Sequence, residues 1–167
     1  MLHNTFCRRL AALVLTLAVA LSAVLPVFAV YPMPVQTATE TEAVYLFNAD
    51  TGKTILNQNA DQQKYVASLT KLMTALLLVE SGKDLNGEVT VPTDLTQEFK
   101  DIQNANGTTM GLRIGETVRR IDLLNAMLIV SANDAASVIA WDVGGSVVGF
   151  VQQMNARAAE LGCTGTN

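Results

Sequence analysis

The sequence predicts a mixed α/β domain of the α+β kind, in which an antiparallel sheet packs with helices. Two short apolar runs within residues 43–56 flank a polar turn, which is the pattern of a β-hairpin. From residue 68 onward the apolar residues recur at helical spacing, and further helical segments occupy residues 121–162. Strand signals in one part of a chain and helical signals in another are typical of this fold class.

The hairpin is predicted from strands at residues 43–47 and 54–56, with Asp50 and Gly52 in the turn between them. A helix with a one-sided apolar stripe follows from Ser68 to about Val79, and Gly82 ends it. Residues 89–91 are compatible with a short strand. Residues 101–115 are rich in Asn, Gly and Thr, and we expect them to form a loop.

Three helices are expected in the last third of the chain. Residues 121–130 are apolar on almost every side, so this helix should be buried. A second helix starts at Asn133 and runs to about residue 143, where two glycines interrupt it. Ser146 is a suitable N-cap for a third helix, which reaches residue 161.

The N-terminal residues 1–29 are predicted to be an export signal. Arg8 and Arg9 precede an apolar stretch over residues 10–27, and small residues stand at the −3 and −1 positions of a cleavage site after Ala29. An uncleaved membrane anchor is the alternative, because residues 10–29 are about long enough to span a bilayer. Both interpretations place the rest of the chain outside the cytoplasm, at the cell envelope.

The remaining chain divides into an extended leader at residues 30–42 and one domain at residues 43–167. Without Arg8 and Arg9 it has 9 basic and 15 acidic residues, a net charge near −6, which argues against a nucleic-acid partner. Cys163 is its single cysteine and His3 lies in the predicted signal, so neither a disulfide nor a Cys/His zinc site is expected. We expect no cofactor and no metal.

Ser68-Leu69-Thr70-Lys71 is the motif with the most chemical content. A serine and a lysine three residues apart lie on the same face of a helix, so the amine can act as the base for the hydroxyl without a histidine. Free N–H groups at the helix start would stabilise an oxyanion on a carbonyl that Ser68 attacks. The alternative is that Ser68 only caps a core helix while Lys71 points into solvent.

Ser131 and Asn133 form the second candidate group. Both lie at the junction of two predicted helices, where either would make an ordinary N-cap. In the functional interpretation they face the same site as Ser68: the Ser131 hydroxyl passes a proton to the leaving group, and the Asn133 amide holds a substrate carbonyl. Asp134 is expected to be a first-turn helix charge rather than a catalytic acid.

Residues 67–77, with the motif Ser68-Leu69-Thr70-Lys71 and its flanks, resemble the serine-type D-alanyl-D-alanine carboxypeptidases, the low-molecular-mass penicillin-binding proteins. The preceding residues 47–53 and the following Ser131-Ala132-Asn133 fit the same family, and the resemblance covers about residues 43–167. It implies a transpeptidase/β-lactamase-like fold, with an antiparallel sheet between helices. It also implies Ser68 as acylated nucleophile, Lys71 as base, Ser131 as proton relay and Asn133 as peptide binder.

The third motif of that family, Lys-Thr-Gly, is absent from the sequence. We therefore expect an incomplete catalytic domain, truncated on its C-terminal side, and a 167-residue chain without turnover. The expected function is removal of the terminal D-alanine from peptidoglycan stem peptides, with β-lactams as covalent inhibitors. A β-lactamase-like hydrolase and a non-catalytic wall-binding module are the alternatives, and peripheral membrane association through a missing C-terminal region is a further expectation.

Overall fold

A β-hairpin opens the part of the chain that the computed structural model describes, residues 42–166. Strand β1 (Val44–Asn48) pairs antiparallel with β2 (Lys53–Gln58), and Leu46 lies opposite Leu56. The register shifts after Leu46, so the hairpin contains a bulge. Gly52 adopts a φ of 65° in the turn, a conformation that glycine reaches without steric cost. The predicted hairpin is confirmed.

A second two-stranded sheet lies between the helices in the chain order. Strand β3 (Glu88–Thr90) pairs antiparallel with β4 (Thr117–Arg119), and helix α3 (Thr96–Asn104) stands between them in sequence. The prediction of a loop over residues 101–115 is therefore wrong for its first part. Residues 101–104 form the end of α3, an amphipathic helix that contacts α5, whereas the Asn, Gly and Thr residues that suggested a loop lie mainly after it, in residues 106–111.

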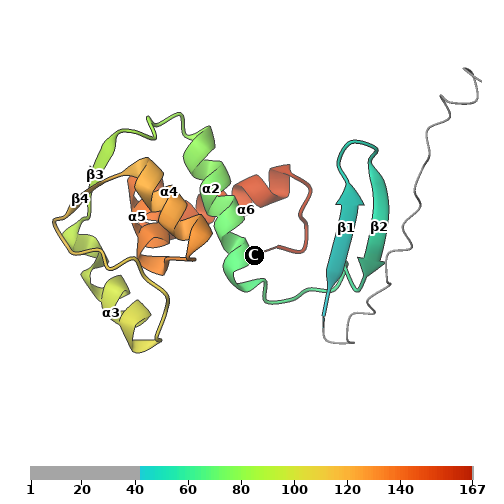
Figure 1. Ribbon diagram of the computed structural model, residues 1–167, viewed down its shortest axis with the longest axis horizontal. Coiled ribbons are helices and arrows are strands. Elements are labelled where there is room, and N and C mark those ends of the chain that lie inside the picture. Colours follow the sequence, from blue (N-terminus) through green and yellow to red (C-terminus); the bar gives the residue numbers. More distant parts are fainter. Residues whose placement is uncertain (1–41, 167) are drawn as a thin grey trace, which may run out of the picture. The chain divides into compact units, whose positions relative to one another are not determined.

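Four helices form the main layer of the domain: α2 (Thr70–Glu80), α4 (Arg120–Ile129), α5 (Asn133–Gly144) and α6 (Val147–Glu160). Helix α5 contacts α2, α3, α4 and α6, and Figure 1 shows α4 and α5 lying directly beside α2. The mixture of helices with antiparallel strands confirms the predicted fold class. Within the described residues the antiparallel pairing forms two separate two-stranded sheets.

The junction of α5 and α6 follows the predicted signals closely. Gly145 ends α5 with a φ of 72°, and the Ser146 hydroxyl accepts a hydrogen bond from the Gly149 amide at 3.0 Å, which confirms the predicted N-cap. Gly144 is required by close packing, because a Cβ there would lie 2.6 Å from the backbone nitrogen of Phe150. The two helices can therefore turn sharply and still pack against each other.

The core is built mainly around α5, and its largest fully buried side chains come from several elements: Phe150, Leu78, Leu123, Met127, Ile139, Val91 and Val138.

One group of ion-paired side chains lies at the edge of this core. Arg120 makes two hydrogen bonds to the Asp142 carboxylate, at 2.7 and 3.0 Å, and Lys83 lies 3.5 Å from the same group. Burial alone would raise the pKa of Asp142, but Arg120 and Lys83 outweigh it and hold that pKa below its ordinary value.

Two apolar stretches are less buried than the sequence suggested. Of the predicted stripe, Leu72 and Val79 on α2 and Leu69 just before it are exposed, and the buried positions of α2 are Thr74 and Leu78 on another face. Residues 128–130, at the end of α4, are also exposed, so the expectation that this helix is buried throughout is wrong. Both helices are apolar on more than one side, and the neighbouring helices cover only part of that surface.

The predicted signal at residues 1–29 and nearly all of the predicted leader at residues 30–42 lie outside the described residues. Among the residues that are described, no single helix has the length and apolar character needed to cross a membrane. Helices α5 and α6 reach that length and apolar character only when they are taken together, and the chain bends by 81° between them.

Candidate active site

Ser68 lies in a single 3₁₀ turn (Ala67–Leu69) that leads directly into α2. The residue before it, Ala67, has a φ of 46°, in the left-handed region that a residue with a Cβ seldom occupies. Such strain is typical of functional sites, where the surrounding structure imposes the conformation. The turn presents the Ser68 hydroxyl beside the first turn of α2, as the sequence predicted, although that first turn is 3₁₀ rather than α-helical.

The Lys71 amine is the centre of the hydrogen-bond network. Its Nζ lies 2.7 Å from Asn133 Oδ1, 2.9 Å from Ser131 Oγ and 2.8 Å from the Ser131 carbonyl oxygen. It also lies 3.5 Å from Ser68 Oγ. The structure therefore brings all four predicted site residues together and excludes the interpretation that Lys71 points freely into solvent.

Partial burial lowers the pKa of the Lys71 ammonium below its ordinary value of 10.5. Among residues 42–166, the oxygens that accept hydrogen bonds from this amine belong to hydroxyl, carbonyl and amide groups. A neutral partner stabilises the charged form less than a carboxylate would. The site is thus suited to an amine that can release its proton and act as a base.

Ser131 bridges the nucleophile and the amine. Its Oγ lies 2.8 Å from Ser68 Oγ and 2.9 Å from Lys71 Nζ, so its hydroxyl can accept a proton from one group and donate to the other. Ser131 itself has a φ of 61°, a second left-handed residue at the site. The chain adopts this conformation where α4 ends, with the amides of Val130 and Ala132 both donating to the Ala126 carbonyl.

Asn133 is the first residue of α5 rather than its cap. The N-cap is Ala132, which makes no side-chain capping bond, so the alternative that Ser131 or Asn133 serves as N-cap is wrong. The Asn133 side chain is directed instead to Lys71 through Oδ1, and its Nδ2 faces Gly107. The amide is therefore held between the amine and the loop that follows α3.

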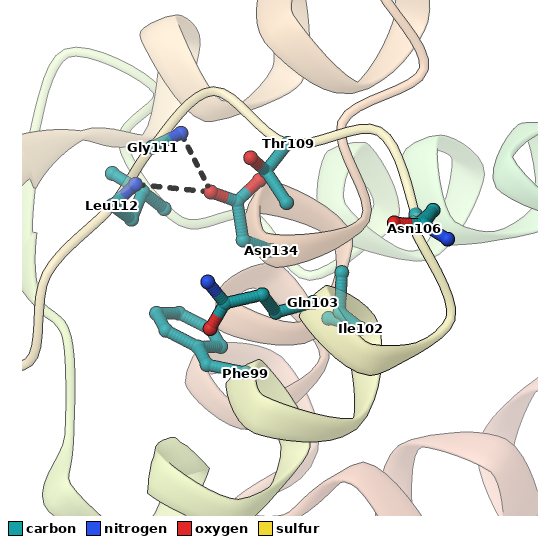
Figure 2. A pocket seen from close by; sticks show the side chains of 9 residues that line it. Phe99, Ile102, Gln103, Asn106, Thr109, Gly111, Leu112 and Asp134 are labelled. Atoms are coloured by element: carbon teal, nitrogen blue, oxygen red, sulfur yellow. Dashed lines mark hydrogen bonds between the residues drawn. The ribbon is translucent and has the colours of Figure 1, made fainter.

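A cavity of about 420 Å³ adjoins the nucleophile. Ser68, Lys71 and Asn133 lie at its polar end, and apolar side chains of α5 and α6, among them Phe150 and Met154, line the rest. A second cavity, of about 530 Å³, is lined by α3, the loop after it and Asp134 of α5 (Figure 2). Among the described residues, no cluster of His, Cys, Asp or Glu could hold a metal ion.

Sequence reasoning missed how the loop after α3 supports this site. Asp134 is 2 % exposed, and its carboxylate accepts hydrogen bonds from the backbone amides of Met110, Gly111 and Leu112, each at 3.0 Å. The sequence does show an acidic residue directly after the candidate Asn133, and this position was the available sign that Asp134 has a role near the site. The prediction of a first-turn helix charge is confirmed, but the sequence does not show that a loop 22 to 24 residues upstream lies against this carboxylate.

Two hydroxyls and an amine lie in mutual contact, and none of the described residues is a histidine; on a mixed α/β fold, this arrangement is suited to serine–lysine acyl transfer. The chain belongs to the D-alanyl-D-alanine carboxypeptidase family, peptidase S11, whose model matches residues 31–167. This family is the one that the two sequence motifs resembled.

Individual relatives agree with the family assignment. The chain is 32 % identical over 132 residues to the D-alanyl-D-alanine carboxypeptidase DacF of Bacillus subtilis, covering 79 % of this chain and 33 % of that protein. It is 31 % identical over 170 residues to the D-alanyl-D-alanine carboxypeptidase of Streptomyces sp. strain K15, covering 96 % of this chain and 56 % of the relative. The chain thus spans about a third to somewhat over half of the length of these relatives.

Solved structures show the same fold. The Streptomyces K15 DD-transpeptidase superposes with a TM-score of 0.63 at 29 % identity, over 75 % of this chain and 50 % of the other. Penicillin binding protein 6B from Escherichia coli superposes with a TM-score of 0.60 at 31 % identity, over 66 % of this chain and 36 % of the other. The described domain therefore has part of the fold of these transpeptidases and penicillin-binding proteins.

Proposed function

We propose that this chain carries the nucleophile and base of a serine-type D-alanyl-D-alanine carboxypeptidase, which removes the terminal D-alanine of peptidoglycan stem peptides through an acyl-enzyme on Ser68. The observation that carries the proposal is the Ser68–Ser131–Lys71 network, with its contacts of 2.8 and 2.9 Å. Membership of the D-alanyl-D-alanine carboxypeptidase family supports the choice of substrate. The relatives carry that activity in their names.

The proton of Ser68 has two routes to Lys71. The direct distance between Ser68 Oγ and Lys71 Nζ is 3.5 Å, at the limit of a hydrogen bond, whereas each contact through Ser131 Oγ is shorter than 3 Å. We therefore favour a relay in which Ser68 passes its proton to Ser131 Oγ as Ser131 passes its own to neutral Lys71. When the amide bond breaks, Ser131 would donate its hydroxyl proton to the departing D-alanine amine as the Lys71 ammonium returns a proton to Ser131 Oγ.

The remaining groups orient the substrate. Asn133 Nδ2 is a donor that can hold a carbonyl of the peptide, while Oδ1 stays on Lys71. The amides of Leu69 and Thr70 already donate to the carbonyls of Val66 and Ala67, so the Ser68 amide is the candidate oxyanion donor of this turn. Water then hydrolyses the ester on Ser68 and completes the reaction.

The substrate and the compartment are proposed together. Peptidoglycan lies outside the cytoplasm, which fits the predicted export signal at residues 1–29. β-Lactams are the expected covalent inhibitors, because they present a strained amide to the same serine. Peripheral attachment to the membrane, through residues beyond this chain, is proposed on the resemblance alone.

Acylation of the 167-residue chain by a fluorescent penicillin tests the proposal. Intact-protein mass spectrometry after long incubation should show one adduct, and peptide mapping should place it on Ser68. The Ser68→Ala variant should show none, whereas Thr70→Ala, two residues away, should retain it. A wild-type chain that is folded by circular dichroism but forms no adduct would contradict the proposal.

The rate of deacylation distinguishes a β-lactamase-like hydrolase from a carboxypeptidase. Release of penicilloate at many equivalents per chain would indicate a β-lactamase-like hydrolase. Acylation without rapid deacylation fits a carboxypeptidase. Because Lys-Thr-Gly is absent from the sequence, we expect the chain by itself to release no D-alanine from a D-Ala-D-Ala peptide.

A further inference from the structure

The Asp134 carboxylate lies inside the protein, and within residues 42–166 the donors of its hydrogen bonds are backbone amides. Oδ1 accepts from Met110 and from the adjacent Ala135, and Oδ2 accepts from Gly111 and Leu112, all within 3.0 Å. Figure 2 shows the carboxylate directed at the loop above it, with dashed bonds to Gly111 and Leu112. Three successive amides of a loop are thus held by one side chain.

The same loop touches the residue before Asp134. The Asn133 amide nitrogen of the backbone donates to the Thr108 carbonyl at 2.8 Å. Gly107 faces the Asn133 side chain, because a Cβ at position 107 would lie 3.0 Å from Asn133 Nδ2 and 3.0 Å from Ile102 Cγ2. Residues 107–112, which we name the α3 loop, therefore contact Asn133 at its backbone and at its side chain.

These contacts restrict the Asn133 side-chain amide at its Nδ2 atom, in addition to the hydrogen bond at Oδ1. Lys71 Nζ lies 2.7 Å from Oδ1 on one side, and Gly107 closes the space behind Nδ2 on the other. If the α3 loop moved away, Asn133 would gain rotamer freedom, and Lys71 would lose a fixed partner. The position of the loop depends on Asp134, which supplies acceptors for three of its amides.

We infer that Asp134 is a positioning residue: by clamping the α3 loop, it orients the Asn133 side chain toward Lys71 and the substrate. Asp134 does not touch the reacting atoms and donates no proton. The inference depends on the proposed function for its kinetic consequence only, since the effect on Asn133 can be measured without catalysis.

Two variants test the inference on the full 167-residue chain. Asp134→Asn replaces one acceptor oxygen by an NH₂ group that faces amide donors, so at least one clamp bond is lost. Gly107→Ala leaves the clamp intact and inserts a methyl group against Asn133 Nδ2. Asp122→Asn is the matched control, because Asp122 also lies in the first turn of a helix but pairs only with the exposed Arg119.

NMR supplies the direct measurement. In Asp134→Asn we expect faster hydrogen exchange at the Met110, Gly111 and Leu112 amides and a displaced side-chain NH₂ signal of Asn133. In Gly107→Ala the three amides should stay protected while the Asn133 signal moves. The rate constant of Ser68 acylation by penicillin should fall about 10- to 100-fold in both variants, as misplacement of a catalytic group by about 1 Å produces. Asp122→Asn should behave as wild type.

The outcomes separate the two proposals. Faster exchange in a folded Asp134→Asn with an unmoved Asn133 signal and an unchanged acylation rate would overturn the inference. If Asp134→Asn does not fold, Gly107→Ala decides, and an unmoved Asn133 signal there would overturn it as well. A wild-type chain that penicillin does not acylate would contradict the proposed function, while the NMR comparison would still decide the role of Asp134.

Discussion

Helices α2 and α5 both carry residues of the candidate site, but their surroundings differ sharply. Six residues of α5 are buried, including Asp134, Val138 and Ile139, and the helix contacts four others. Only Thr74 and Leu78 are buried in α2, and Leu72 on its outer side is 63 % exposed. One helix is enclosed by the domain, and the other lies along its edge.

This difference indicates a division of roles. Helix α5 and the loop clamped to it supply fixed geometry, because their positions are determined by packing and by buried hydrogen bonds. Helix α2 supplies the reactive groups, and Ser68 and Lys71 lie at its accessible end. Substitution of Lys71 in α2 should therefore change the chemistry with little effect on stability, and substitution of buried apolar residues in α5 should change stability.

Lys71→Arg should have the largest effect, on the chemistry side of the comparison. Arginine keeps the positive charge but does not release its proton, so it cannot accept the proton of Ser68. We expect Ser68 acylation to slow by about 10²–10⁴-fold with little change in the melting temperature. Near-normal acylation by a folded variant would show that the residue serves only as a fixed charge.

The wild-type pH profile sharpens the same prediction. In the proposed mechanism the base is neutral Lys71, whose pKa is lowered by burial, so the acylation rate should rise with pH through a midpoint below 10.5. Stopped acylation time courses across the alkaline range measure this midpoint. A flat profile would exclude Lys71 as the titrating base.

Ile139→Ala tests the scaffold role of α5. Ile139 is 1 % exposed, and its truncation leaves a cavity among residues that cannot close completely. We expect a loss of about 2–5 kcal/mol in the free energy of unfolding, measured by urea titration. A loss below about 1 kcal/mol would show that α5 is not the centre of the core.

Arg120→Met tests the ion-pair group at the edge of α5. The Asp142 side chain is only 9 % exposed, so removal of Arg120 leaves a largely buried charge with Lys83 as its remaining partner. We expect a loss of about 2–3 kcal/mol, somewhat less than the cost of breaking a fully buried pair. Arg119→Met is the control, because Arg119 pairs with Asp122 at an exposed position.

The sign of the acid dependence follows from the lowered pKa of Asp142. A carboxylate with a depressed folded-state pKa stabilises the fold above its unfolded pKa, and this stabilisation is lost as the pH falls through the folded value. For Asp142 that window lies below pH 3.8. Arg120→Met should therefore lose less stability than wild type on acidification there, which urea titrations at several pH values can detect.

Leu72→Ala should have the smallest effect and completes the comparison. Leu72→Ala removes as many carbon atoms as Ile139→Ala, but it does so at an exposed position of α2, where little packing is lost. We expect the free energy of unfolding to change by no more than about 0.5 kcal/mol. A loss in the free energy of unfolding as large as that of Ile139→Ala would show that α2 and α5 contribute equally to the core.

The sequence alone identified the family, the hairpin, the long helices and the four site residues as candidates. Each of these has a local signal: an Asp-Gly turn, an apolar period, a capping serine at 146, or a serine and a lysine one turn apart. The end of α3 is not recognised from the sequence because residues 103–104 continue into the Asn-, Gly- and Thr-rich segment that follows, and the contact of α3 with α5 joins distant residues.

Tertiary structure decided the rest, because it depends on contacts between residues far apart in the chain. The Lys71–Ser131 contact joins residues 60 positions apart, and the hydrogen bonds of Asp134 to the α3 loop span 22 to 24 positions. No local pattern shows which apolar face of α2 is covered, since Thr74 and Leu78 are buried while Leu72 is not. Sequence determined which groups are present, and packing determined which of them meet.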